Sequence, residues 1–399
     1  MHSRAVRHGG RLTLMALAAS LAMAAPALAA AGAPPDGWHT WNAAGPQRNE
    51  ELRGVAARGP ADAWAVGYRE DGSGVSVPVA ERFDGRAWRA TSVPGQSGAG
   101  QLDAVAPLSA HDVWAVGTWN DKSAGQDRSL GEHFDGRAWH TVPLPAEPAN
   151  RSAYPSALAA VRPDDIWAVG VTAEDRLGSP RPLTYHWDGH RWASVATPST
   201  GGDALLEGAT PDGAGGAWAV GVAYDAQGAG HPLTEHWDGR AWRIVPAPHT
   251  AGQGESLNAV TAAGPDDIWA VGGGGPSDGA THPLTLHWDG HSWTRVATPT
   301  AAANLHAVSA DAHGRLWAVG EQQGVDTPAF TLRWDGTAWH TVPADSGPGG
   351  TGASLFGVAT VPHPRPGGPT AWTVGSTLPQ LQPTWHPVIE GFGPAPSAH

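Results

Sequence analysis

The chain has 399 residues, of which 54 are Gly, 36 are Pro and none is Cys, and its formal net charge is −13. The lack of Cys excludes a disulfide framework, thiol catalysis and thiolate metal sites. The negative charge disfavours nucleic acid and anionic lipid as partners, because both would be repelled.

The N-terminus has the pattern of a secretory signal peptide, predicted over residues 1–29. Arg4, Arg7 and Arg11 precede an apolar run from Leu12 to Met23, and Ala27-Leu28-Ala29 forms an A-x-A cleavage site. The alternative is an uncleaved membrane anchor. No later segment is long and apolar enough to span a bilayer. We therefore expect an exported protein with no membrane insertion after cleavage.

A tetrapeptide of the type Trp-Ala-Val-Gly recurs about every 50 residues through the rest of the chain, a spacing typical of stacked supersecondary units such as propeller blades. The tryptophans of these WAVG-type segments are Trp64, Trp114, Trp167, Trp218, Trp269, Trp317 and Trp372.

Each repeat is predicted to contain four short strands. In the fifth repeat these are Leu257–Val260, the WAVG segment at Trp269, a third strand at Pro283–Trp288, and a fourth from Trp293 to a Pro. Asp289-Gly290 predicts a hairpin between the last two, because Gly accepts the positive φ that such turns need. Four strands in a meander make one propeller blade.

The two ends of the repeat region complete one another. Trp38-His39-Thr40 has the pattern of a fourth strand with no blade before it, and Val388–Phe392 that of a third strand with no fourth after it. We therefore predict an all-β, seven-bladed β-propeller over residues 37–393, closed by the N-terminal strand, with a linker at 30–36 and a C-terminal tail at 394–399. Closure removes free sheet edges.

The repeat resembles the kelch repeat over about residues 37–393. Both have a hydrophobic strand ending in Gly, a variable loop, an aromatic residue ending the third strand and a Trp opening the fourth. The double glycine is complete only at Gly272-Gly273, and Trp or Phe replaces the repeat Tyr. The resemblance implies a propeller, with members that range from protein-binding modules to oxidases. The Tyr–Cys cofactor of the galactose oxidase type is excluded, because the chain has no Cys.

Most of the 21 Trp residues are predicted to pack between blades, with indole N–H groups bonded to neighbouring backbone. Besides the WAVG residues, these are Trp38, Trp88, Trp139, Trp192, Trp242, Trp293 and Trp339 at the start of fourth strands, and Trp187, Trp237, Trp288 and Trp334 at the end of third strands. Trp41, Trp119 and Trp385 fall outside this pattern, and Trp119, expected in a variable loop, is the one ligand candidate among them.

Two further side-chain types recur in the third strands. The histidines cannot converge on one metal ion, because equivalent positions in neighbouring blades lie roughly 10 Å apart: His133, His186, His236 and His287. The glutamates are assigned a structural hydrogen-bonding role: Glu81, Glu132, Glu235 and Glu390. Ser309–Trp317 is similar to a sialidase box but is one residue longer and lacks the Thr, so we interpret it as a turn. No metal or other cofactor is expected.

The position after the first-strand Leu varies most between repeats, whereas a purely structural position should look alike in every blade. Its residues are Arg53, Asp103, Ala159, Glu207, Asn258, His306 and Phe356. We predict that a ligand site is formed by Arg53, Asp103, Glu207, Asn258 and His306 around the channel mouth, with Tyr68, Trp119 and Tyr224 in the loops above. The alternative is a solvated channel with no ligand.

These observations favour a secreted, non-enzymatic, monomeric binding or interaction module whose ligand is a glycan or a protein. One alternative is a propeller hydrolase or lyase that acts on polysaccharide with paired carboxylates such as Asp103 and Glu207. Another is a scaffold that meets its partner at the rim.

Overall fold

The structure, a computed structural model, describes residues 36–45, 49–94, 98–174, 178–276, 279–324, 329–345, 352–377 and 384–394. The predicted signal peptide, nearly all of the predicted linker and residues 395–399 of the predicted tail lie outside these ranges. Every regular element in the described ranges is a β-strand. None of the described residues forms a helix that could cross a membrane.

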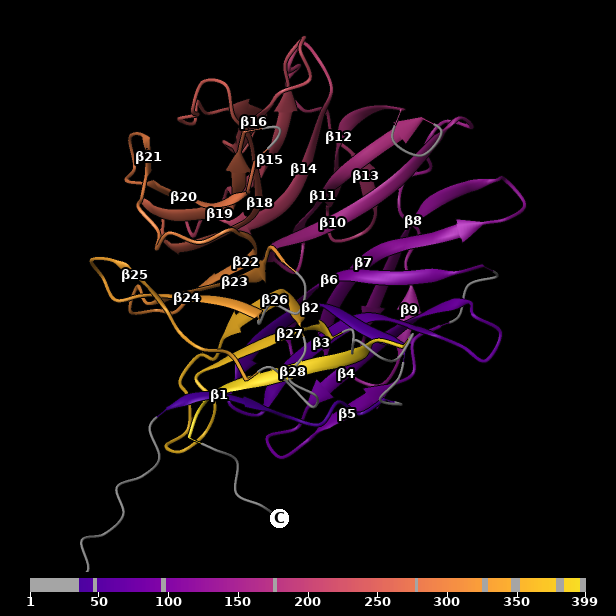
Figure 1. Cartoon of the computed structure of the whole chain (residues 1–399). Helices are drawn as coiled ribbons and strands as arrows, with labels where there is room; N and C mark the ends of the chain where they lie inside the picture. Colours follow the sequence, from indigo (N-terminus) through magenta and orange to yellow (C-terminus); the bar gives the residue numbers. More distant parts are fainter. Residues whose placement is uncertain are drawn as a thin grey trace, which may run out of the picture. The chain divides into compact units, whose positions relative to one another are not determined.

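The strands form seven four-stranded antiparallel sheets, as the repeat predicts (Figure 1). Blade 1 contains β2 (Glu50–Gly59), β3 (Asp62–Glu70), β4 (Ser76–Phe83) and β5 (Trp88–Thr91). Blade 2 contains β6 (Gly100–Ser109), β7 (Asp112–Asp121), β8 (Gln126–Phe134) and β9 (Trp139–Thr141). Blade 3 contains β10 (Arg151–Arg162), β11 (Asp165–Glu174), β12 (Gly178–Trp187) and β13 (Trp192–Ser194). Blade 4 contains β14 (Ala204–Pro211), β15 (Ala217–Tyr224), β16 (Gly230–Trp237) and β17 (Trp242–Ile244).

Blade 5 contains β18 (Gly254–Gly264), β19 (Asp267–Gly275), β20 (His282–Trp288) and β21 (Trp293–Arg295). Blade 6 contains β22 (Ala303–Ala310), β23 (Leu316–Gln322), β24 (Ala329–Trp334) and β25 (Trp339–Thr341). Blade 7 contains β26 (Ala353–Thr360), β27 (Ala371–Thr377), β28 (His386–Gly393) and the N-terminal β1 (Gly37–Thr40). The fourth strands are shorter than predicted, since β21 ends at Arg295 before any Pro is reached.

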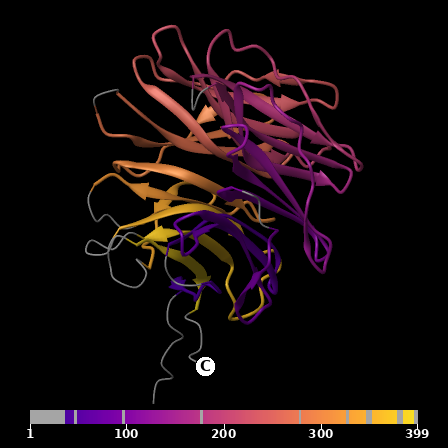
Figure 2. The ribbon, with the colours of Figure 1, turned by 90° about the vertical axis from the view of Figure 1, so that its right-hand side faces the viewer.

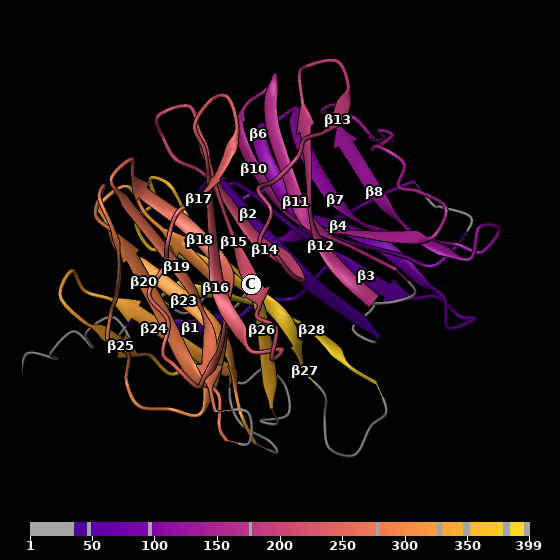
Figure 3. The same ribbon diagram turned by 90° about the horizontal axis from the view of Figure 1, so that it is seen from above.

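The ring closes as predicted. Trp38 of β1 pairs with Phe392 of β28, so the start of the chain supplies the outer strand of the last blade. The first strand of each blade contacts the first strand of the next, and β2 contacts β26. Figure 2 shows the indigo and yellow strands side by side, and Figure 3 shows the blades following one another in chain order. The result is a seven-bladed β-propeller.

The two faces of the ring carry different connections. Links from a fourth strand to the next first strand, and from a second to a third strand, lie on the face that we call the channel-mouth face. Turns from first to second strands and from third to fourth strands lie on the opposite face. Because first strands start at the channel-mouth face, residues early in β2, β6 and their equivalents lie near that end of the channel.

An aromatic cluster fills each boundary between blades. Trp64 of blade 1 lies 4.9 Å from Phe134 and 5.4 Å from Trp139 of blade 2, measured between ring centroids. At the closure, Trp317 lies 4.8 Å from Trp38 and 4.5 Å from Phe392. The same three positions meet at the five remaining boundaries, as shown by the pairs Trp372–Trp88, Trp114–Trp192, Trp167–Trp242, Trp218–Trp293 and Trp269–Trp339.

The predicted indole hydrogen bonds to backbone are mostly wrong. Trp187 does donate to the carbonyl of Pro163, but Trp139 donates to the Thr91 hydroxyl. Ten indole N–H groups have no partner in the part of the chain that the structure describes: Trp38, Trp64, Trp88, Trp114, Trp167, Trp192, Trp242, Trp293, Trp339 and Trp385. The fourth-strand indoles stand edge-on against the WAVG ring of the preceding blade, as in the pairs Trp38–Trp317 and Trp88–Trp372.

The recurring histidines have a structural role within their own blades. The ring of His186 lies 4.4 Å from that of Trp167, and its Nε2 is 2.9 Å from Asp165 Oδ1. The pairs His133–Asp112, His236–Asp212 and His287–Asp267 repeat this hydrogen bond. In blade 1, Arg82 lies over Trp64 and pairs with Asp62. In blades 1 to 5 the Arg or His side chain beside the WAVG Trp is thus bonded to a carboxylate.

Trp41 is partly buried and packs against the core, although its position does not follow the repeat. Its ring lies 5.1 Å from Trp372 and 5.5 Å from Phe83. Blade 7 has Gly391 where other blades have His or Arg, and a Cβ there would come within 2.8 Å of the Trp41 indole nitrogen. Trp41 therefore occupies the space that the missing side chain leaves.

The recurring glutamates are buried, and two of them have the expected hydrogen bonds. Glu81 accepts from the backbone N–H groups of Ala44 and Gly45, and Glu132 accepts from the Thr141 hydroxyl. Glu235 departs from the expectation, because neither of its carboxyl oxygens has a partner among the described residues.

Candidate functional site

The variable position after the first-strand Leu is a β-bulge. In β2 the pairing register skips from Leu52 to Gly54, which leaves Arg53 as the extra residue. The same skip leaves out Asp103, Glu207, Asn258, His306 and Phe356. A bulge leaves its extra residue unpaired and re-aims the side chain. All six line one cavity on the channel axis.

Blade 3 differs from the prediction. Its bulge lies between Pro155 and Ala157, so Ser156 rather than Ala159 lines the channel. Ala159 pairs with Trp167 and is fully buried. The assignment was wrong because Leu158 imitates the first-strand Leu, whereas Pro155, opposite Gly170, holds the place that this Leu has in other blades.

The channel cavity is small. Its volume is about 200 Å³, below the range of roughly 300–1,000 Å³ that is usual for sites of drug-sized ligands. It is lined by the first strands of all seven blades. Water or one small group of a ligand fits inside, and the rest of a larger ligand would have to lie over the mouth.

Arg53 is neutralised by its neighbours. Its Nη1 lies 3.2 Å from Asp103 Oδ1, and its Nε lies 3.0 Å from Glu51 Oε1. Its guanidinium carbon lies 5.7 Å from the ring centre of Tyr68. Gln101 donates a second hydrogen bond to Asp103. Burial raises the pKa of Asp103 to about 6, although the charge of Arg53 opposes the rise.

Glu207 is the least engaged of the channel residues. None of the described residues forms a hydrogen bond with its side chain. Burial raises its pKa to about 7, and the negative charge of Asp103 adds to the rise. Across the ring, Asn258 donates to the carbonyl of Leu305 at 2.7 Å, and His306 Nε2 lies 3.6 Å from Glu321. The contact with His306 lowers the pKa of Glu321 to about 2.

Tyr68, Trp119 and Tyr224 lie in strands β3, β7 and β15, not in the loops where we expected them. The WAVG strands extend further than the tetrapeptide itself suggests. Trp119 pairs with Gly100 and is half-buried against the cluster between blades 1 and 2. Tyr224 is 37% exposed and borders a cavity of about 800 Å³ with Thr200 and other residues of blades 3 and 4. Tyr224 is therefore the most accessible aromatic of the three.

Sequence reasoning missed a polar cluster beside Trp119. Tyr154 donates to Asp127 at 2.8 Å, and Asn120 donates to the same carboxylate at 2.7 Å. These residues line a hollow of about 200 Å³ over blade 2, which Ser76 of blade 1 and Tyr154 of blade 3 border. Aligning Pro155 with the first-strand Leu of other blades would have singled out both Tyr154 and Ser156.

The described residues contain no group of three or more His, Asp or Glu side chains placed to hold a metal ion. The recurring histidines are instead each bonded to the aspartate of their own blade.

Comparison with known proteins supports the fold alone. No protein-family model matches the chain, and no curated protein matches it. Among solved structures, it is similar to YCF48 bound to D1 peptide, with a TM-score of 0.53 and 12% identity over 92% of this chain and 97% of that one. It is also similar to an ulvan lyase of polysaccharide lyase family PL25 bound to -[GlcA(1-4)Rha3S]-, with a TM-score of 0.54 and 10% identity over 90% and 94% of the two chains.

A third similar structure is the extracellular domain of the one-component system BT4673 from B. thetaiotaomicron, with a TM-score of 0.53 and 10% identity over 89% of this chain and 40% of that one. Propellers of this shape thus include peptide-bound, lyase and extracellular examples. Identities this low carry no residue roles across.

Proposed function

We propose that this protein is an exported binding module, built on a divergent kelch-like repeat, that takes a glycan or a protein segment at its channel-mouth face. The observation that supports this most is the bulge ring. A bulge re-aims a side chain while pairing continues on both sides of it, and the re-aimed position is where the repeats differ. Export rests on the N-terminal sequence pattern.

Charge at the channel mouth favours a neutral or basic ligand. Arg53 is matched by Glu51 and Asp103, while Glu207 and Glu321 add further carboxyls. An anionic ligand would meet net negative potential, since no free cation balances these groups in the described channel lining. A hydroxyl-rich sugar or an amine-bearing segment is compatible with it.

The Tyr224 cavity supports a glycan in particular. Its volume of about 800 Å³ falls within the usual range of ligand sites. An exposed aromatic ring beside Asp203, Asp225 and Thr200 offers an apolar face together with hydrogen-bonding groups. Leu205, which also borders the cavity, lies two residues before Glu207 in β14, so the cavity adjoins the channel mouth.

A polysaccharide lyase or hydrolase is the second candidate. Glu207, with its pKa raised to about 7, would suit a general base near neutral pH. Two observations rank this reading lower. Asp103 is tied to Arg53 and Gln101 and is not a free second carboxylate, and the channel cavity is too small to take a sugar chain past Glu207.

The proposal is tested by screening the protein from Ala30 onward on glycan and peptide arrays, with release of reducing or unsaturated sugar assayed in parallel. We expect retained neutral or basic ligands and no released sugar. Release of sugar would replace the binding module with the enzyme. Absence of binding to every ligand on both arrays would contradict a channel-mouth site for either ligand class.

Binding of a basic ligand should strengthen as pH rises. The carboxyls of Asp103 and Glu207, with pKa values of about 6 and about 7, are neutral at pH 5 and ionised at pH 8. We expect affinity for the basic ligand to increase about tenfold over that pH interval. The variant Glu207→Gln should lose the part of this increase that occurs at the higher pH values, because Glu207 has the higher pKa of the two. Titrations at fixed ionic strength check this. A flat profile in the unaltered protein would show that neither carboxylate meets the ligand.

A further inference from the structure

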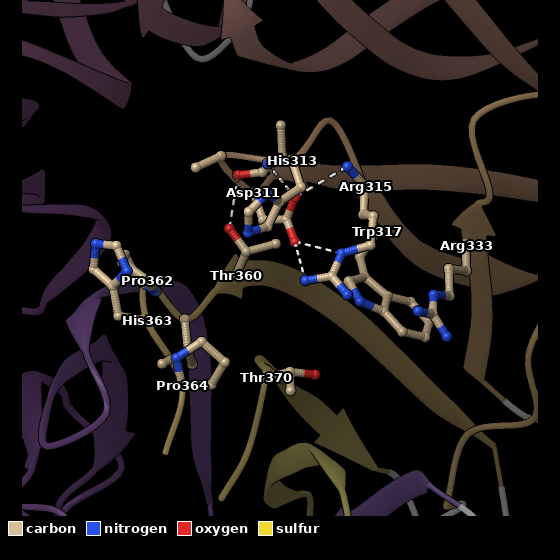
Figure 4. Close-up of a pocket in the computed structure, with 13 residues that line it drawn as sticks. Asp311, His313, Arg315, Trp317, Arg333, Thr360, Pro362, His363, Pro364 and Thr370 are labelled. Carbon is tan, nitrogen blue, oxygen red and sulfur yellow. Dashed lines mark hydrogen bonds and ion pairs between the residues drawn. The ribbon is translucent and has the colours of Figure 1, made fainter. Parts of the chain in front are cut away.

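A separate cavity lies on the opposite face, between blades 6 and 7. It has a volume of about 260 Å³ and is formed by the turn at 311–315 and by the loop at 361–370 (Figure 4). The turn is the stretch that resembles a sialidase box, and the structure confirms it as a turn between β22 and β23. The channel-mouth site uses none of these residues.

The charge pattern of the repeat breaks at this cavity. In blades 1 to 5 the Arg or His side chain beside the WAVG Trp is bonded to an aspartate, as in Arg82–Asp62 and His133–Asp112. In blade 6, Arg333 stands opposite Trp317, as Arg82 stands opposite Trp64. Two residues before that Trp, however, blade 6 has Arg315 where blade 1 has Asp62. The aspartate that blades 1, 2, 3 and 5 have at this position is replaced by a second cation in blade 6. Blade 4 has Gly216 there and uses Asp212, the equivalent of Asp311, as the partner of its His236.

The one nearby carboxylate is already engaged. Asp311 Oδ2 lies 2.7 Å from Arg315 Nε and 2.6 Å from Arg315 Nη2, and its Oδ1 accepts from the backbone N–H groups of His313 and Arg315. Figure 4 shows Asp311 and Arg315 facing each other across the turn, apart from Arg333.

Arg333 is held in place without an acidic partner. Its guanidinium carbon lies 5.5 Å from the ring centre of Trp317 and 5.6 Å from that of Phe392. No carboxylate of the described residues forms an ion pair with it. His313 and His363, both exposed, are the other titratable groups at the cavity. The cavity is therefore cationic, in a chain whose formal net charge is −13.

We propose that this cavity binds the carboxylate of a small acid, with Arg333 as the group that recognises it. The planar guanidinium matches a carboxylate in a bidentate arrangement, and stacking on Trp317 fixes its orientation in advance. The cavity is slightly smaller than sites for drug-sized ligands, so it takes one small molecule or one terminal residue. The acid is either a free organic acid or the terminal uronate of a glycan.

The test is a calorimetric titration with glucuronate, with glucose as the uncharged match. Arg333→His restores the side chain of blades 2 to 5, and Arg315→Asp restores the aspartate that would neutralise Arg333. We expect each change to weaken glucuronate binding at least about tenfold. Arg82→His is the matched control, since Asp62 already pairs with that arginine, and it should leave the affinity unchanged.

Saturable glucuronate binding that is lost in both blade 6 variants supports the proposal. Equal binding of glucose, no saturation, or unaltered affinity in Arg333→His would overturn it. Acetate competing as well as glucuronate would assign the site to free acids, and tighter binding of a uronate-ended oligosaccharide would assign it to chain ends; both support a carboxylate site. Glu207→Gln should not affect glucuronate binding, because Glu207 does not line this cavity. The test of this cavity is therefore independent of the channel-mouth proposal.

Discussion

Replacing Trp38 with Ala is expected to lower the free energy of unfolding by about 3–5 kcal/mol, the usual cost of deleting a large buried aromatic side chain. Trp38 is 4% exposed and packs edge-on against Trp317 and Phe392. It also lies in the four-residue strand β1, which closes the ring. The loss should therefore combine a cavity in the aromatic cluster with weakened pairing of β28.

Urea unfolding followed by tryptophan fluorescence measures this change. Trp119→Ala is the control, because Trp119 is only half-buried and packs on the outside of a boundary cluster, and it should cost less than half as much. If Trp38→Ala is as stable as the unaltered protein to within about 0.5 kcal/mol, closure of the ring by β1 is not what holds the ends together.

Replacing Glu235 with Leu is expected to raise the free energy of unfolding by about 2 kcal/mol at pH 9. Glu235 is 0% exposed, and burial raises its pKa to about 8 from 4.5. The folded state therefore holds a proton that the unfolded chain releases above pH 4.5, so stability falls as pH rises toward 8 and the penalty is complete above it. Leu286 and Leu332 occupy the same position in blades 5 and 6 and are fully buried, so Leu is known to fit.

Unfolding curves at pH 5 and pH 9 separate the charge from the packing contribution, because Glu235 is neutral at the lower pH. The gain should be larger at pH 9. Glu132→Leu is the matched variant in blade 2, and its gain should be smaller because it breaks the bond from Thr141. A gain for Glu235→Leu that is the same at both pH values would mean that ionisation of Glu235 does not destabilise the folded state.

The fold could be predicted because the determinants repeat. The WAVG segments give the second strands, Asp-Gly steps such as Asp289-Gly290 give the last hairpin, and Gly290 indeed has a φ of 89°. Ring closure followed from two incomplete ends, Trp38 and Val388–Phe392, that match as fourth and third strands. Hydrogen-bond partners of the indoles could not be predicted, because the packing angle between rings depends on how neighbouring blades are rotated.

The candidate site was only partly accessible to sequence. Arg53, Asp103, Glu207, Asn258 and His306 stood out because they vary, yet the bulge that turns them into the channel appears only in the pairing register. In blade 3 the bulge position was predicted wrongly. Leu158 was taken for the first-strand Leu, whose place is held by Pro155, three residues earlier. The lone guanidinium of Arg333 was missed, since its importance depends on which carboxylates its neighbours have already engaged.

We propose that ligands bind where the bulge residues meet, and one titration tests this most directly. The tightest ligand from the arrays is titrated into the unaltered protein, into a triple variant at the channel mouth (Asp103→Asn, Glu207→Gln, His306→Gln), and into a control triple variant on exposed turns of the opposite face (Arg137→Ala, His190→Ala, Arg240→Ala). We predict a loss of at least about 100-fold in the first variant and unchanged affinity in the second. Affinity that survives all three channel-mouth substitutions would contradict the site.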